Sequence, residues 1–215
     1  MRDTYVITGA SRGIGAYLAE YYERKNKIVI RASRSCGYDV TIDEDVEVLA
    51  SLPSQVDVLI NCAGIAAMNA AALMPSKTVR DIVNTNLIGT HNVCTALFPK
   101  MRHIDARIIN FSSIAASLAL HGECIYAASK AGVETMTKVL AKEWAPWGIT
   151  VNCIAPNPIR TDLIRGVPQP LLDKLVNEQA IKRYGTMEDV ANICDFFIDP
   201  RSEFITGQII RMGGP

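Results

Sequence analysis

The sequence lacks the patterns that mark a disulfide framework, a metal site or a membrane anchor. Its six cysteines, among 215 residues, include no C-x-x-C pair and no Cys/His spacing of a zinc ligand set. It shows neither a signal-peptide core nor an uncharged apolar run near the ~18 residues of a membrane helix. We therefore expect a cytoplasmic protein with reduced thiols, no bound metal and no membrane partner.

An excess of charge of one sign is also missing. Lys+Arg and Asp+Glu both total 22, so the basic surface of a nucleic-acid-binding protein is not expected. Hydrophobic residues make up 49% of the chain and charged residues 20%, which is typical of a globular protein with a sizeable core rather than of a disordered chain. At this length we expect a single domain, 1–215.

What the sequence does contain is an alternation of short β-branched runs with helical stretches. The runs are often apolar on both faces, as expected for parallel strands covered by helices. The alternation predicts an α/β fold: one Rossmann-type, doubly wound parallel sheet in three α/β/α layers. We expect strands at 5–7, 28–30, 56–60, 107–111, 150–154 and 208–211, and helices near 14–25, 43–51, 77–98, 125–144 and 187–198.

Local signals mark the ends of two helices and one irregular segment. Thr186 followed by Asp189 resembles a capping box at the start of the last helix, and Pro146 and Gly148 end the helix before it. Segment 155–186 contains several prolines and breaks the alternation. We therefore expect it to form a mobile substrate flap over a cleft.

A glycine-rich turn, T-G-A-S-R-G-I-G, follows the first strand and opens the first helix. Glycines let the backbone approach a pyrophosphate, and the helix N-terminus offers free N–H groups and a favourable dipole. The spacing departs from G-x-G-x-x-G, and a tight turn without a ligand is the alternative interpretation. The candidate dinucleotide-binding residues here are Gly9, Ser11, Arg12, Gly13, Ile14 and Gly15.

The end of the second strand bears on the choice of dinucleotide. An acid that holds the adenosine ribose usually stands there, but this chain has Ser33 and Arg34 and no acid before Asp39. Together with Arg12 in the glycine turn, Arg34 favours a 2′-phosphate, because a guanidinium binds phosphate in a fork. We therefore predict NADP(H) over NAD(H); the alternative is that both are ordinary surface arginines.

The chemistry-bearing pattern is Tyr126-Ala-Ala-Ser-Lys130, with Ser113 upstream. Tyr126 and Lys130 share one helix face, so the ammonium is expected to lower the pKa of the phenol and fit it for general acid–base work. An amphipathic helix with an ordinary tyrosine and a solvated lysine is the alternative. Ser113 follows a predicted strand, and its alternative role is simply to end that strand.

Together these patterns resemble the short-chain dehydrogenase/reductase family along almost the whole chain, and the general pattern is closest to its 3-oxoacyl-acyl-carrier-protein reductases. The further matching motifs are Asp39-Val40, the stretch Asn61-Cys62-Ala63-Gly64, Asn86 within N-T-N, the segment Pro156 to Thr161 with Ile159, and Phe204 to Gln208 followed by Gly213-Gly214. The resemblance implies that Asp39, Val40, Asn61, Ala63, Gly64, Pro156, Ile159 and Thr161 border the cofactor.

The resemblance implies a reversible hydride transfer between the nicotinamide and a carbonyl or secondary alcohol. Tyr126 would be the proton donor and Ser113 would polarise the carbonyl. Lys130 would hold the nicotinamide ribose, and Asn86 would anchor a water that joins Lys130 to solvent. Tyr126 and Lys130 are therefore expected both in catalysis and in cofactor binding. The alternatives are a catalytically silent dinucleotide-binding regulatory or interaction protein, or nucleotide-sugar chemistry, which usually comes with a larger substrate domain.

The substrate is expected between loop 114–123 and the flap, against an apolar lining that favours an acyl or other lipophilic molecule, including a carrier-bound 3-oxoacyl thioester. Arg160 and Arg165 would face an acidic carrier. Family members usually form homodimers or homotetramers through the helices near 77–98 and 125–144, and we expect the same here. The apolar candidates are Ile114, Ala115, Leu118, Leu120, Leu163, Ile164, Val167 and Leu171.

Three departures from the family pattern stand out. Only a few residues around 35–37 separate the second strand from the third, where the family has a helix. Asn157 replaces the usual Gly after Pro156, and asparagine is expected to tolerate a positive φ there. The sequence also ends at Pro215, without the longer tail that covers the substrate site in some members.

Overall fold

The order of the strands predicts a cleft at the carboxyl ends of the central strands. In the computed structural model, which describes residues 3–214, six parallel strands run in the order β2-β1-β3-β4-β5-β6. Because the chain winds outward from β1 to β2 and then crosses to β3 on the other side, the direction of winding reverses between β1 and β3. Such a switch point opens a crevice at the carboxyl ends of the strands. The strands are β1 Thr4–Thr8, β2 Ile28–Ala32, β3 Val58–Asn61, β4 Arg107–Phe111, β5 Thr150–Ala155 and β6 Ile209–Arg211.

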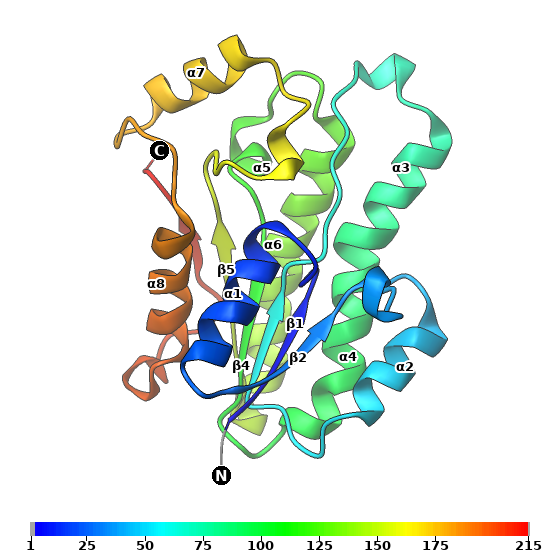
Figure 1. Ribbon diagram of the computed structural model, residues 1–215, viewed down its shortest axis with the longest axis vertical. Helices are drawn as coiled ribbons and strands as arrows, with labels where there is room; N and C mark the ends of the chain where they lie inside the picture. Colours follow the sequence, from blue (N-terminus) through cyan, green and yellow to red (C-terminus); the bar gives the residue numbers. More distant parts are fainter. Residues whose placement is uncertain (1–2, 215) are drawn as a thin grey trace.

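Helices cover both faces of the sheet (Figure 1). On one face, α1 (Gly13–Arg24) and α8 (Met187–Ile198) bury Leu18, Tyr22 and Phe197. On the other, α2 (Asp43–Ser51), α4 (Gly89–Met101) and α6 (Cys124–Trp144) bury residues such as Leu97 and Leu140. Strands β3, β4 and β5 are buried along their whole length, because helices shield both faces. The predicted α/β, doubly wound, three-layer fold is confirmed, while residues 1, 2 and 215 lie outside the described residues.

The end signals of the helices are as predicted. Thr186 accepts a hydrogen bond from the Asp189 backbone N–H, and the Asp189 carboxylate accepts one from the Thr186 N–H, which closes the capping box of α8. Helix α6 ends at Trp144, followed by a 3₁₀ turn containing Pro146 and by Gly148 at φ 76°. Within residues 3–214, none of the helices is both long and apolar enough to cross a bilayer.

The helix predicted near 77–98 is interrupted by a wider turn. It divides into α3 (Ser76–Val83), a π-helical turn at Asn84–Ile88, and α4. A π turn inside an α-helix inserts one residue per turn and is frequent at functional sites. Gly89 follows the turn at a close approach to the segment after β2: a Cβ there would lie 2.5 Å from Cγ2 of Val40.

The comparison with the family pattern placed a further strand a few residues after the second one, and the structure has no strand there. After Ala32 the chain makes a 3₁₀ turn at Arg34–Cys36, passes Asp39 and Val40 in irregular conformation, and enters α2. Parallel strands need a crossover of a dozen or more residues, and the few residues available here are too short for one. Strand β2 is therefore an edge of the sheet.

The segment 155–186 contains two elements that the sequence did not reveal. These are a 3₁₀ turn at Asp162–Ile164 and α7 (Gln169–Glu178), which lies above the carboxyl ends of the strands in Figure 1. Both ends of the segment are fixed: Ile159 forms a bridge with Gly185, and the Ile181 N–H donates to the Gly213 carbonyl at 3.1 Å.

Asn157 fixes the start of the flap in a way that glycine cannot. The positive φ that asparagine was expected to tolerate here is not needed, since the φ of Asn157 is not among the positive values of residues 3–214. Instead its side-chain amide donates to the Met212 carbonyl. The tail after β6 thus holds the flap at Asn157 and, through Gly213, at Ile181. The remaining short helix, α5 (Ala115–Leu118), lies in the loop after β4.

Candidate active site

The glycine turn lines a cleft of about 350 Å³ at the carboxyl ends of β1, β2 and β3. Of the cofactor residues predicted from the sequence, the structure brings together in this cleft Gly9, Ser11, Arg12, Gly13, Ile14, Gly15, Ser33, Arg34, Asp39, Val40, Ala63, Gly64 and Thr161. Tyr38 and Thr85 also line this cleft. They were not predicted from the sequence, because their position depends on the irregular segment after β2 and on the π turn.

The three glycines of the turn have different roles. Gly9 has φ +65°, and a Cβ there would lie 2.7 Å from the Ala63 nitrogen; one on Gly15 would lie 2.5 Å from the Gly9 carbonyl oxygen. These two positions exclude side chains because backbone packs on them. Gly13, at φ +57°, would meet only Thr161, at 3.8 Å. It therefore keeps the cleft open beside the first N–H groups of α1, which no side chain caps.

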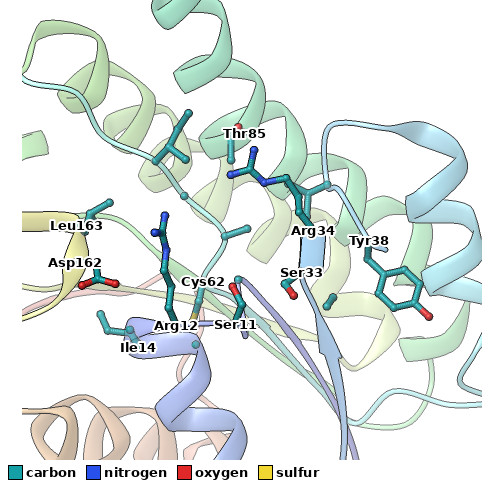
Figure 2. A pocket seen from close by; sticks show the side chains of 18 of the residues that line it. Ser11, Arg12, Ile14, Ser33, Arg34, Tyr38, Cys62, Thr85, Asp162 and Leu163 are labelled. Carbon is teal, nitrogen blue, oxygen red and sulfur yellow. The ribbon is translucent and has the colours of Figure 1, made fainter. Parts of the chain in front are cut away.

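Two arginines extend over this cleft from opposite sides (Figure 2). Arg12 comes from the turn before α1 and Arg34 from the segment after β2. Both are exposed, and neither pairs with an acid among residues 3–214. Arg31, by contrast, makes a bidentate pair with Glu23 at 2.8 and 2.6 Å. Two unpaired guanidiniums beside free helix N–H groups form a donor set that fits a phosphorylated dinucleotide.

Two further polar residues of this cleft are occupied by local bonds. Ser33 Oγ lies 2.9 Å from Ser35 Oγ. The Asp39 carboxylate accepts hydrogen bonds from the N–H and hydroxyl of Thr41, at 2.9 and 2.7 Å. The segment after β2 is therefore held in shape by its own side chains, as expected where the crossover helix is missing.

A second cleft, of about 500 Å³, adjoins the first and shares Ile14, Thr161 and four other lining residues with it. It contains Ser113 from the end of β4, and Tyr126 and Lys130 from α6. Pro156 and Ile159, predicted as cofactor residues, also line it. The two clefts form one continuous trough, so a ligand bound along the glycine turn would reach the polar side chains at its far end.

Tyr126 is a buried phenol beside the Ser113 hydroxyl. Burial raises the pKa of Tyr126 to about 12, and the negative charge of Glu123 acts in the same direction, whereas the interaction with Ser113 lowers it. The prediction that Lys130 lowers this pKa is wrong for the structure without ligand. The ammonium lies 6.0 Å from the centre of the phenol ring, and burial has the larger effect.

The Lys130 ammonium is itself buried at the junction of the two clefts. It donates to the Phe111 carbonyl oxygen at 2.8 Å, and a Cβ on Gly64 would lie 3.5 Å from it. Burial lowers the pKa of Lys130 to about 8. A lysine that titrates near neutrality and faces a cleft is a candidate functional group.

Asn86 lies in the π turn and is fully buried. Its side-chain oxygen accepts from the Ile65 N–H at 2.8 Å, and its amide donates to the Ile65 carbonyl and to Ser129 Oγ at 2.9 and 3.1 Å. It thereby holds the loop after β3 against α6. Asn86 Oδ1 and Lys130 Nζ both border Gly64, so the structure brings Asn86 close to the catalytic candidates.

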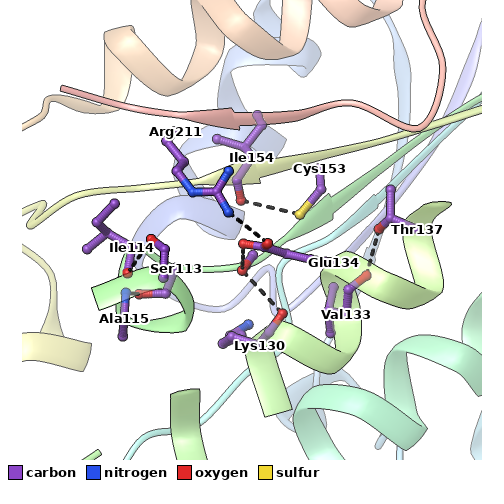
Figure 3. Close-up of polar contacts among 12 residues, drawn as sticks. Ser113, Ile114, Ala115, Lys130, Val133, Glu134, Thr137, Cys153, Ile154 and Arg211 are labelled. Carbon is purple, nitrogen blue, oxygen red and sulfur yellow. Dashed lines mark hydrogen bonds and ion pairs between the residues drawn. The ribbon is translucent and has the colours of Figure 1, made fainter. Parts of the chain in front are cut away.

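One turn after Lys130, a partly buried ionic network joins α6 to the sheet (Figure 3). The Glu134 carboxylate accepts from Ser112 Oγ at 2.9 Å and pairs with Arg211 of β6 at 3.0 Å. Ser112 Oγ also lies 3.2 Å from the Lys130 carbonyl. The network fixes the backbone that carries Lys130 relative to β4 and β6.

Not every predicted residue lines the trough. Asn61 is buried below it, where its amide donates to Asn110 Oδ1 at 2.9 Å and contacts the Cys94 sulfur. Leu118 and Leu171 are largely exposed, while Leu172 and Leu175 line the second cleft. Glu123 is a lining residue that the sequence reasoning missed; its position three residues before Tyr126 was a usable signal.

Comparison with known proteins gives concordant matches over almost the whole chain. The family model described as Enoyl-(Acyl carrier protein) reductase matches residues 31–214. The 3-oxoacyl-(acyl-carrier-protein) reductase FabG of Staphylococcus epidermidis is 33% identical over 240 aligned positions, covering 100% of this chain and 98% of that protein. The alignment is longer than the chain, as expected where the chain lacks segments of its relative.

Two solved structures share the fold closely. The aldohexose dehydrogenase of Thermoplasma acidophilum superposes with a TM-score of 0.88 at 28% identity, covering 99% of this chain and 93% of that one. A small-chain dehydrogenase in complex with NADPH gives a TM-score of 0.90 at 26% identity and covers 100% and 98%. In the second, NADPH is bound to a chain of the same architecture.

Proposed function

The chain belongs to the short-chain dehydrogenase/reductase family and is an NAD(P)-dependent oxidoreductase acting on CH–OH groups, and on this basis we propose that it reduces the carbonyl of a 3-oxoacyl thioester with NADP(H), reversibly. The observation that carries the proposal is the continuous trough. It joins a glycine-rich, arginine-lined cleft to a second cleft holding Ser113, Tyr126 and Lys130.

The residues of the second cleft have complementary roles. When bound, the nicotinamide supplies the hydride. Tyr126, protonated at neutral pH, gives its proton to the carbonyl oxygen that becomes the alcohol. Ser113 donates a hydrogen bond to the same oxygen and so favours the negative charge that develops there. Lys130, charged below about pH 8, holds the ribose hydroxyls and favours the phenolate left behind.

Proton return to Tyr126 requires a route to solvent. Asn86 and Lys130 both border Gly64, and we assign to Asn86 the positioning of the water through which Lys130 exchanges protons. The π turn supports this assignment, because it places a fully buried asparagine beside the loop that borders both clefts.

NADP(H) is favoured over NAD(H) by Arg12 and Arg34, which offer unpaired guanidiniums where an NAD-selective site has an acid. Asp39, the first acid after β2, lies seven residues beyond the end of that strand, and one of its carboxylate oxygens is already bonded to Thr41. The NADPH bound to a related chain supports the same preference.

The 3-oxoacyl substrate class is favoured by the lining of the second cleft. Apolar side chains from the loop after β4 and from the flap surround Tyr126, and they suit an acyl chain. The 33% identical relative is by its name a 3-oxoacyl reductase. The apolar lining comprises Ile114, Ala115, Leu120, Leu163, Ile164, Val167, Leu172 and Leu175.

We further propose a cytoplasmic homodimer or homotetramer that accepts carrier-bound acyl groups. All six cysteines are free, which suits a reducing compartment. Arg160 and Arg165 belong to the flap, but Arg160 stacks on Tyr184 and Arg165 pairs with Asp162 at 2.5 Å. A carrier would therefore have to displace these contacts to use them.

The direct test is oxidation of NADPH and of NADH, followed by absorbance, with a panel of 3-oxoacyl thioesters, diketones and quinones. We expect turnover with NADPH, fastest with a 3-oxoacyl thioester. If only quinones or diketones are reduced, the proposed reductase activity would stand, but 3-oxoacyl thioesters would be rejected as its substrates. Inertness toward the whole panel, with NADPH still bound, would reject the reductase.

A further inference from the structure

The substrate cleft holds one carboxyl group that the proposed mechanism does not use. Glu123 precedes the first residue of α6 and lines the cleft together with Ser113 and Tyr126. Both groups line the same cleft, and the negative charge of Glu123 raises the pKa of the Tyr126 phenol, so the two side chains lie near each other. Glu123 and Tyr126 can therefore contact neighbouring groups of one substrate, separated by one or two carbon atoms.

Glu123 has no structural partner among residues 3–214. Its carboxyl group takes part in no hydrogen bond or ion pair there, and although it occupies the N-cap position of α6, it caps none of the helix N–H groups. Buried polar groups normally have partners. A half-buried carboxyl without one, in a cleft that accepts ligands, is available to a ligand.

The surroundings shift the Glu123 carboxyl toward its neutral form. The other titratable groups lining the cleft are Cys62, Tyr126, Lys130 and Asp162. The Lys130 ammonium is bonded to the Phe111 carbonyl, while Asp162 is itself an acid and is paired with Arg165, so among residues 3–214 no cation is paired with Glu123. Burial raises the pKa of Glu123, and a substrate that displaces water from the cleft raises it further.

We propose that Glu123 recognises the second carbonyl of a 1,3-dicarbonyl substrate. In its neutral form it donates a hydrogen bond to the thioester oxygen of a 3-oxoacyl chain, while Ser113 and Tyr126 hold the 3-oxo group. No bond is made or broken at Glu123. An ionised carboxylate only accepts hydrogen bonds and would repel that oxygen. The inference rests on the proposed reductase activity and names the feature that selects its substrate.

The assignment has a pH signature. The acid form is present below the pKa of Glu123, so kcat/KM for a 3-oxoacyl thioester is highest there and falls as pH rises through that pKa. Lys130 gives a separate fall near pH 8. A monoketone, which has no second carbonyl, shows only the fall due to Lys130.

The experiment compares wild type, Glu123→Gln and Glu123→Leu on a 3-oxoacyl thioester and on the matching monoketone, in which a methylene replaces the thioester carbonyl. Because Gln donates an N–H at every pH, Glu123→Gln should remove the lower-pH fall and keep kcat/KM for the thioester within about threefold. Glu123→Leu should reduce the thioester-to-monoketone ratio about tenfold, the effect of one neutral hydrogen bond. Glu143→Gln, exposed on the same helix, is the matched control and should change neither.

Three results would overturn the inference. A thioester-to-monoketone ratio unchanged in Glu123→Leu would mean that Glu123 does not contact the second carbonyl, while monoketone turnover still supports the reductase. With the matching 3-hydroxyketone as a third substrate, a preference for it over the thioester that is lost in Glu123→Gln would mean that an ionised Glu123 accepts a hydrogen bond from a hydroxyl. Inertness of wild type toward both carbonyl compounds would reject the proposed function itself, and this inference with it.

Discussion

At the scale of single residues, Lys130 is held in an environment that disfavours its charge. Burial lowers its pKa from 10.5 to about 8. Between these values the unfolded chain binds a proton that the folded chain does not, so folding is favoured as pH rises through that range. Below about pH 8 the full unfavourable contribution is present. The buried charge of Lys130 therefore lowers the stability of the folded protein, and we infer that it is kept for function.

Lys130→Met should therefore abolish turnover and stabilise the protein at pH 7, by about 2–3 kcal/mol after allowing for the lost bond to Phe111. The difference in unfolding free energy from wild type should shrink as pH rises from about 8 to 10.5. Urea denaturation at several pH values measures it. Lys138→Met, exposed on the same helix, should show no such gain; an equal gain in both variants would mean that burial of Lys130 is not the cause.

A second residue-scale prediction concerns the cofactor phosphate. Arg34→Ala should weaken NADPH binding about tenfold or more, as expected when one charged hydrogen bond worth roughly 1.5–3 kcal/mol is lost, and should leave NADH binding nearly unchanged. Fluorescence titration with both dinucleotides measures this. Arg31→Ala is the control, because Arg31 is paired with Glu23. Equal weakening of NADPH and NADH binding by Arg34→Ala would contradict the phosphate assignment.

At the scale of elements, the tail after β6 fixes the flap that covers the second cleft. Gly213 has φ +79°, and a Cβ there would lie 2.6 Å from Gln179 Oε1 and 2.7 Å from the Asn157 amide nitrogen. Gly37 also has a positive φ, +82°, but nothing lies within 4 Å of its Cβ position. A side chain at Gly37 would therefore strain only the backbone, whereas one at Gly213 would also push against the flap residues Asn157 and Gln179.

We expect Gly213→Ala to lower the unfolding free energy by about 2–4 kcal/mol, since it adds overpacking to strain, and Gly37→Ala by only about 1 kcal/mol. Gly213→Ala should also raise the KM for the carbonyl substrate, because the flap lines its cleft. Thermal melts and steady-state kinetics provide the measurements. Similar effects of the two substitutions would show that the tail does not hold the flap.

Elements also show where sequence reasoning succeeded and where it failed. The capping residues and the short β-branched runs act locally, so α8 was predicted to the residue and the six expected strands to within two residues at each end. The π turn around Asn86 was not, because it depends on packing of the Asn86 amide against Ile65 and Ser129. Helix α7 was missed because the prolines around it mask a short amphipathic stretch.

The same contrast holds within the site. The spacing of the motifs predicted that Ser113, Tyr126 and Lys130 lie together, and all three line the second cleft. The prediction succeeded because Ser113 follows a strand and the other two share one face of a helix. The expected effect of Lys130 on the pKa of Tyr126 was wrong, because spacing says nothing about burial or about the competing Phe111 carbonyl. The absence of a strand directly after β2 could have been predicted, because the few residues there are too short for the crossover that a parallel strand needs. The comparison with the family pattern nevertheless placed a strand at that point.

At the scale of the whole molecule, the exposed apolar side chains bear on assembly. Ile88 in the π turn and Val139 on α6 are each 45% exposed, on the helices through which family members usually associate. We expect light scattering to give a mass that is two or four times 23.5 kDa. Val139→Glu should shift the protein toward smaller species, whereas Val48→Glu, exposed on α2, should not. A monomeric wild type would contradict the proposed oligomer.

The central claim is that Tyr126 supplies the proton in a reduction driven by NADPH. The most direct measurement pairs NADPH binding with NADPH consumption in wild type and Tyr126→Phe, on the same preparation and with a 3-oxoacyl thioester. Loss of one general acid costs about 10²–10⁴ in rate, whereas loss of one neutral hydrogen bond to the cofactor costs about tenfold at most, so Tyr126→Phe should still bind NADPH and should lose turnover by the larger factor. Turnover in Tyr126→Phe within a few-fold of wild type would contradict the account.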